Sequence, residues 1–108
     1  MQAFEELEEK WGRWAVLREG NVVACASGTA ALHLALETLQ LPPGSEVICP
    51  EFTMIACARA ISLAGLTPVF VDCNEDLLLD LDLVDEAGAS REGRIKAIMS
   101  VNIYGRVV

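Results

Sequence analysis

The chain has 108 residues, of which 53% are hydrophobic and 22% are charged, and its formal net charge at pH 7 is −8. This length fits one domain or part of one, and the high hydrophobic content argues against a disordered chain. The negative charge argues against nucleic acid and against anionic membrane surfaces as partners.

Apolar spacing predicts two helices and one strand in the first forty residues. Large apolar residues at helical spacing, separated by glutamates, predict a helix over residues 2–14. A short apolar run predicts a strand over residues 21–26, and a longer apolar segment predicts a helix over residues 28–40. The helix-breaking sequence Leu-Pro-Pro-Gly over residues 41–44 ends this helix.

Strands and helices are expected to alternate through the rest of the chain. The pattern predicts strands over residues 46–49, 67–71 and 95–101, and helices over residues 53–64 and 81–87. The resulting order, β-α-β-α-β-α-β with short connections, is typical of α/β proteins.

The strands are apolar along their whole length, which indicates burial on both faces. Residues 68–71, Pro-Val-Phe-Val, show this most clearly. We therefore predict an α/β fold with three α/β/α layers and a mostly parallel sheet, formed by residues 1–108 as a single partial domain. Residues 101–108 follow a strand without a closing helix, so we expect a sheet that this chain leaves incomplete.

The cysteine and acidic residues do not form a recognisable metal site. The four cysteines make no CxxC pair, there is one histidine, and all four thiols lie in or beside apolar runs; they are Cys25, Cys49, Cys57 and Cys73. The acidic segment that begins at Asp72 resembles a calcium loop, but Leu77 and Leu83 stand where glycine and glutamate are required. We predict no metal, no catalytic thiol and a solvated acidic loop.

The N-terminus lacks the features of a targeting segment. It is acidic and amphipathic, without the basic start and apolar stretch of a signal peptide. No window approaches the roughly 18 apolar residues that a membrane span requires. We therefore expect a cytoplasmic protein without a membrane partner.

Residues 25–31, Cys-Ala-Ser-Gly-Thr-Ala-Ala, join the first predicted strand to the following helix. The free N–H groups and dipole at a helix N-terminus favour an anion such as phosphate. Ser27 and Thr29 could add hydroxyl donors, and Gly28 would let a ligand approach the backbone closely. The alternative interpretation is an ordinary N-cap made by Ser27 or Thr29.

A second candidate segment, Pro50-Glu51-Phe52-Thr53-Met54, follows the next predicted strand. In a parallel sheet it would lie at the same carboxyl edge as residues 27–29, where ligands bind. The alternative interpretation is that Phe52 and Met54 belong to the core.

Four collinear segments resemble one enzyme family. Residues 26–36 (ASGTAALHLAL) resemble the SGTAALHLAL signature of the DegT/StrS-type sugar aminotransferases, and residues 42–53 (PPGSEVICPEFT) resemble their PGDEVI-x-P-x-FT segment. Residues 64–72 (AGLTPVFVD) resemble their GA-x-PVFVD strand, and residues 94–105 resemble their TKAI…VHLYG segment. The four matches cover nearly the whole chain and are specific as a set.

This resemblance implies the N-terminal part of the large domain of a fold-type-I enzyme that uses pyridoxal 5′-phosphate (PLP). Such enzymes transfer an amino group, usually from glutamate, to a keto group of a nucleotide-linked sugar, and they work as homodimers. The implied cofactor-binding residues are Ser27, Gly28, Thr29 and Ala30 at the phosphate, and Phe52, Thr53 and Met54 near the ring. Met54 departs from the aromatic residue that is common there, and Asn102 departs from a common histidine.

The resemblance also implies that the catalytic residues are missing from this chain. The family's Schiff-base lysine and its pyridine-pairing aspartate would lie beyond residue 108, and the lysines present are Lys10 and Lys96. Amino transfer on PLP needs both groups. We therefore expect a fragment that is inactive on its own. The competing hypothesis is a non-catalytic phosphate-binding or oligomerisation module that retains the first half of the fold.

Overall fold

A computed structural model describes residues 2–15 and 21–108. In chain order the elements are α1 (Gln2–Trp14), α2 (Gly28–Thr38), β1 (Glu46–Pro50), α3 (Ala56–Leu63), β2 (Thr67–Val71), α4 (Leu81–Ser90), β3 (Ile95–Ile98) and the short 3₁₀ helix η1 (Ile103–Gly105).

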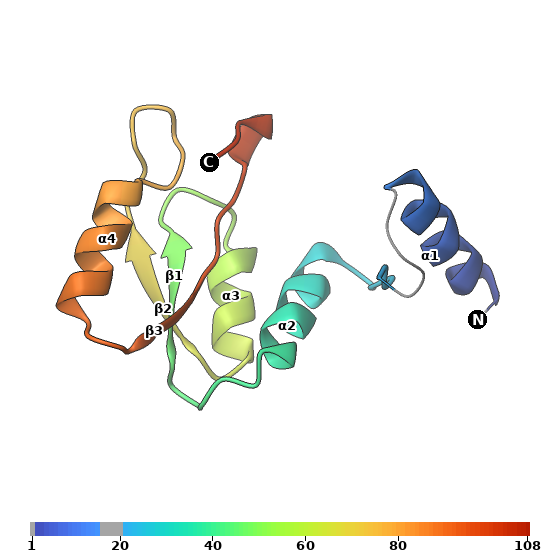
Figure 1. The fold of residues 1–108 in the computed structure, drawn as a ribbon, viewed down its shortest axis with the longest axis horizontal. Coiled ribbons are helices and arrows are strands. Elements are labelled where there is room, and N and C mark those ends of the chain that lie inside the picture. Colours follow the sequence, from blue (N-terminus) through green and yellow to red (C-terminus); the bar gives the residue numbers. More distant parts are fainter. Residues whose placement is uncertain (1, 16–20) are drawn as a thin grey trace.

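The three strands form a parallel sheet in the order β2-β1-β3, with β1 at its centre (Figure 1). Ile48 of β1 lies opposite Val69 of β2 and Ile98 of β3. The pairing of β1 with β3 extends one residue further, because the Met99 N–H donates to the Ile48 carbonyl at 2.8 Å.

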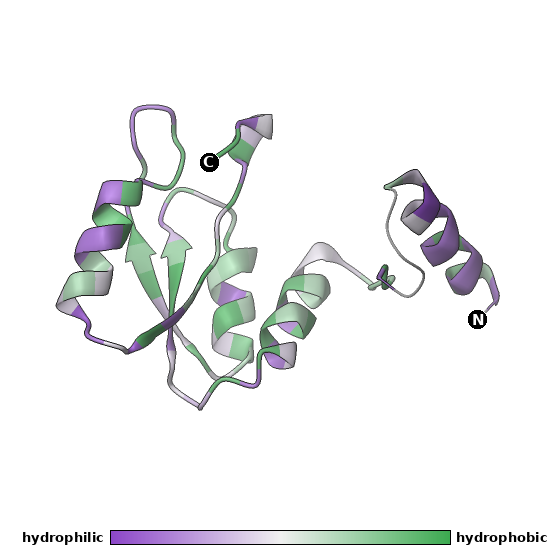
Figure 2. Cartoon of the chain, viewed as in Figure 1, coloured by the Kyte–Doolittle hydropathy of each residue, from purple (hydrophilic) through white to green (hydrophobic). Residues whose placement is uncertain are grey.

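Helices cover both faces of this sheet because successive side chains of β1 point in opposite directions. Val47 and Cys49 are fully buried in one cluster with residues of α2 and α3. Ile48 is buried in a second cluster with β2 and α4. Figure 2 shows the arrows of β1 and β2 in hydrophobic green and α1 mainly in hydrophilic purple. The predicted α/β fold with a parallel sheet between helical layers is confirmed.

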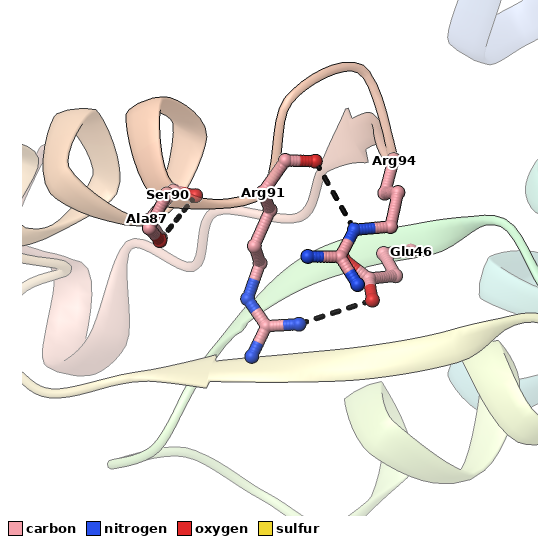
Figure 3. A network of polar contacts seen from close by, with 5 residues as sticks. All are labelled: Glu46, Ala87, Ser90, Arg91 and Arg94. Carbon is pink, nitrogen blue, oxygen red and sulfur yellow. Dashed lines mark hydrogen bonds and ion pairs between the residues drawn. The ribbon is translucent and has the colours of Figure 1, made fainter.

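An ion pair fastens the amino edge of the sheet, where β1 begins (Figure 3). Arg91, which follows α4, donates from Nη1 to Glu46 Oε1 at 3.0 Å, and the Glu46 side chain is only 13% exposed. The Arg94 Nε–H donates to the Arg91 carbonyl at 3.3 Å and closes the same turn. The pair therefore ties the connection between α4 and β3 to the central strand.

The predicted strand over residues 21–26 is wrong. Residues 21–25 have no regular secondary structure and run beside α1. The Ala24 N–H donates to Glu8 Oε1 at 2.8 Å, and Val22 lies against Gly12. An apolar run becomes a strand only where another strand offers hydrogen-bond partners, and the three strands of the described residues pair with one another instead.

Several predicted boundaries also shift. Helix α3 begins at Ala56 rather than at residue 53, so Thr53 and Met54 lie in the β1–α3 loop. Helix α2 stops at Thr38 because Gln40 adopts a left-handed φ of 49°. Strand β3 is shorter than predicted and α4 is longer, while β2 matches its predicted range.

Helix α1 stands apart from the sheet and its covering helices (Figure 1). The radius of gyration is 15.7 Å, against about 13 Å for a compact domain of this length. The apolar stripe of α1 is consequently exposed, with 52% of Trp11 and 76% of Trp14 accessible to solvent. In the parts of the chain that the structure describes, no helix is both long enough and apolar enough to cross a membrane.

Candidate functional site

The N-terminus of α2 is capped by Ser27. The residue has extended backbone angles, φ −161° and ψ 167°, and its Oγ accepts a hydrogen bond from the Ala30 N–H at 3.1 Å. The Ser27 carbonyl accepts from the Ala31 N–H at 3.0 Å. Among the described residues, no acceptor is recorded for the N–H groups of Gly28 and Thr29. The N-cap interpretation therefore holds for Ser27, and two donors remain for an anion.

The space beside Gly28 is open. A Cβ placed on this residue would meet no atom within 4 Å, and Gly28 is not among the glycines with a positive φ. Neither the backbone conformation nor a neighbouring side chain therefore explains a glycine at this position. A phosphate needs close access to backbone N–H groups, and this open space provides it.

The β1–α3 loop, residues 51–55, is exposed except at Thr53. Phe52 is 42% exposed and Met54 is 75% exposed, whereas Thr53 between them is half-buried. The interpretation that Phe52 and Met54 are core residues is therefore wrong. The Thr53 hydroxyl lies 3.9 Å from the Cys57 Sγ, which is itself buried in the core cluster.

The two candidate segments lie at the same end of the fold. Helices α2 and α3 pack side by side, and both begin at the edge where β1 and β2 end (Figure 1). Residues 27–30 thus share the carboxyl edge of the sheet with residues 52–54. This edge is where parallel α/β sheets bind ligands.

The Cys49 thiol, which is fully buried in the core at the end of β1, is unreactive. Burial raises the pKa of the Cys49 thiol from 9.0 to about 11, and the neighbouring Cys57 adds to the rise. At neutral pH Cys49 is therefore protonated and a poor nucleophile. The two lysines lie elsewhere, Lys10 on α1 and Lys96 within β3.

The acidic loop after β2 supplies hydrogen-bond acceptors for its own backbone N–H groups. Asn74 Oδ1 accepts from the Asp76 N–H at 2.9 Å and from the Leu78 N–H at 3.2 Å. Arg106 reaches across to Asp76 Oδ1 at 3.6 Å and joins this loop to the segment after β3. In residues 2–15 and 21–108, no group of three or more His, Cys, Asp or Glu side chains is placed to hold a metal ion.

One contact escaped the sequence analysis, which treated Cys57 as a structural thiol. The structure places this thiol against the Thr53 hydroxyl of the candidate loop. The spacing of four residues between them is the signal that could have suggested it.

Comparisons with known proteins agree with this arrangement. The model of the DegT/DnrJ/EryC1/StrS aminotransferase family matches residues 2–108. The chain is 44% identical over 87 residues to GDP-perosamine synthase of Caulobacter vibrioides, covering 81% of this chain and 23% of that protein. It is 48% identical over 83 residues to UDP-N-acetyl-3-dehydro-alpha-D-glucosamine 3-aminotransferase of Acidithiobacillus ferrooxidans, covering 77% of this chain and 22% of that protein.

Solved structures give the same result for the fold. NtdA from Bacillus subtilis, solved with its bound cofactor PMP, matches with a TM-score of 0.85 and 31% identity, over 97% of this chain and 23% of that one. The chain thus spans less than a quarter of the length of these relatives. It belongs to the DegT/DnrJ/EryC1/StrS family, whose members are PLP-dependent aminotransferases.

Proposed function

We propose that this chain forms the phosphate-binding part of the cofactor site in an aminotransferase of nucleotide-linked keto sugars. The observation that carries the proposal is the start of α2, where the Gly28 and Thr29 N–H groups have no acceptor among the described residues and the space beside Gly28 is open. Membership in an aminotransferase family gives this anion site a specific ligand, the phosphate of PLP.

The residues of the chain bind and orient the cofactor. The Gly28 and Thr29 N–H groups donate to the phosphate, and the Ser27 and Thr29 hydroxyls add donors beside them. The dipole of α2 favours the negative charge at this end. When bound, PLP supplies the electron sink on which amino groups are transferred.

The exposed side chains of the β1–α3 loop cover the cofactor ring in this proposal. Phe52 offers an aromatic face, and the Met54 thioether offers a polarisable one in place of the more common aromatic residue. Both side chains are accessible at the carboxyl edge.

The names of the relatives support the substrate class. One is a perosamine synthase that is named for a GDP-sugar, and another acts on a UDP-linked 3-dehydro sugar. We propose a nucleotide-linked keto sugar as the amino acceptor, glutamate as the donor and a homodimer as the working assembly. In this proposal the Schiff-base lysine and the pyridine-pairing carboxylate are not among residues 1–108, so the 108-residue chain alone binds PLP without transferring amino groups.

Calorimetry with two ligands tests the cofactor site. PLP should bind the chain, pyridoxal without its phosphate should bind at least tenfold more weakly, and inorganic phosphate should compete with PLP. Equal affinity for PLP and pyridoxal would contradict the proposal. The activity itself is tested on the protein from the complete reading frame, with PLP, glutamate and a nucleotide-linked keto sugar.

An oligomerisation module is the second candidate function. The observation that favours it is the exposed apolar stripe of α1, formed by Phe4, Leu7, Trp11 and Trp14. Calorimetry and sedimentation together distinguish the two, because an oligomerisation module associates but does not bind PLP.

A further inference from the structure

The β1–α3 loop is held by few polar contacts. The Glu51 N–H donates to the Val71 carbonyl at 2.9 Å at one end, and the Cys57 N–H donates to the Met54 carbonyl at 3.3 Å at the other. Ile55, the N-cap of α3, makes no side-chain capping bond. Among the described residues, the contact from Thr53 to Cys57 is the side-chain hydrogen bond recorded for residues 51–55.

The thiol side of this contact is rigid. Cys57 is 5% exposed and belongs to the buried cluster that includes Val47, Cys49 and Ile61. Its Sγ therefore has a fixed position, 3.9 Å from the Thr53 Oγ1. In sequence, Thr53 lies between Phe52 and Met54, and it is half-buried where both of these neighbours are exposed.

We propose that Cys57 is a positioning residue: its buried thiol holds the Thr53 hydroxyl toward the core, and this keeps Phe52 and Met54 presented at the carboxyl edge. The consequence for the cofactor rests on the proposed function above. The consequence for loop order does not, since the contact exists within this chain without a ligand.

Cys49 provides a matched control for this role. It lies in the same buried cluster and is also fully enclosed, but its Sγ contacts the Pro50 carbonyl at 3.6 Å and not Thr53. Truncating either thiol removes similar volume from the same core. Only truncation of Cys57 removes the contact with the loop.

The experiment measures hydrogen exchange of the Glu51 and Cys57 amides, relative to their intrinsic rates, on the 108-residue chain without ligand, because these two N–H groups donate to the Val71 and Met54 carbonyls at the two ends of the loop. Cys57→Ala should accelerate this exchange by about fivefold, the effect of losing one hydrogen bond. Cys49→Ala should leave the exchange of these two amides unchanged relative to the rest of the chain.

A second variant keeps the test decisive if the core variants do not fold. Thr53→Val removes the hydroxyl from a half-buried loop residue and leaves the core thiol in place; it should accelerate exchange as Cys57→Ala does. The double variant should add nothing further, because both changes delete the same contact. Additive effects of the two single changes would overturn the assignment.

PLP titration of the same variants separates this inference from the proposed function. Cys57→Ala should weaken PLP binding by a similar factor of about five, and Cys49→Ala should leave it unchanged. If the unmodified chain does not bind PLP, the proposed function fails, while the exchange data still decide the role of Cys57. If PLP binds the unmodified chain and Cys57→Ala equally well, the loop is not positioned by this thiol.

Discussion

Replacing Gly28 with alanine separates the stability of the fold from ligand binding at the start of α2. The added methyl group would meet no atom of the chain within 4 Å, and the backbone at Gly28 is not left-handed. Alanine is a better helix former than glycine by up to about 1 kcal/mol. The free energy of unfolding should therefore stay the same or rise slightly.

The same methyl group should impair phosphate binding. It would occupy the open space through which an anion reaches the N–H groups of Gly28 and Thr29. Losing one hydrogen bond to a charged group costs about 1.5–3 kcal/mol, which corresponds to roughly a 10- to 100-fold weaker affinity. We expect a loss of this size in the dissociation constant for PLP and little change for pyridoxal.

The assay pairs a thermal melt with a PLP titration and uses Gly88→Ala as its control. Gly88 lies in α4, away from the carboxyl edge, and a Cβ there would also meet no atom within 4 Å. The control should gain stability in the same way and bind PLP as the unmodified chain does. If Gly28→Ala melts normally and binds PLP with unchanged affinity, the phosphate does not sit at this turn.

Three further predictions concern the fold. Arg91→Ala should lower the free energy of unfolding by about 1–3 kcal/mol, because it leaves the carboxylate of Glu46 mostly buried and unpaired; an unchanged denaturation midpoint would contradict this. Burial raises the pKa of Cys49 from 9.0 to about 11 on folding, so the folded state disfavours the thiolate. The free energy of unfolding should therefore keep its full value below pH 9 and fall by up to about 3 kcal/mol as the pH rises through 11. Denaturant titrations from pH 8 to 11 should show this loss, and Cys49→Ala should reduce it. The exposed stripe of α1 should cause self-association that Trp14→Glu weakens in sedimentation experiments; a monomer before the substitution would refute this.

The strands show where sequence reasoning succeeds and where it fails. Strand β2 was predicted to the residue because a continuous apolar run lies between Gly65, which ends α3 with a φ of 74°, and the acidic loop. The apolar run of residues 21–26 has similar composition but forms no strand. Pairing is a non-local property, and no neighbour for this segment is encoded in its own residues.

The start of α3 was missed for a related reason. Thr53 was expected in the first turn of the helix, where a hydroxyl often caps free N–H groups. In the structure its hydroxyl contacts the Cys57 Sγ instead, and α3 begins at Ala56. Helix propensity alone does not decide whether the Thr53 hydroxyl caps the helix or contacts the Cys57 thiol. The choice determines that Phe52 and Met54 lie on a loop at the edge of the sheet rather than on a helix.

The two interpretations of Ser27, an N-cap and part of an anion site, turn out to be compatible. Its Oγ accepts a hydrogen bond from the N–H of Ala30, the third residue of α2, and its carbonyl accepts one from the N–H of Ala31. The first two N–H groups, on Gly28 and Thr29, have no acceptor among the residues that the structure describes, as is usual for the first turn of a helix. Capping by Ser27 fixes the helix terminus in place while leaving these donors to a ligand. The residue that stabilises the helix therefore also pre-organises the proposed phosphate site, which reduces the ordering that binding would otherwise require.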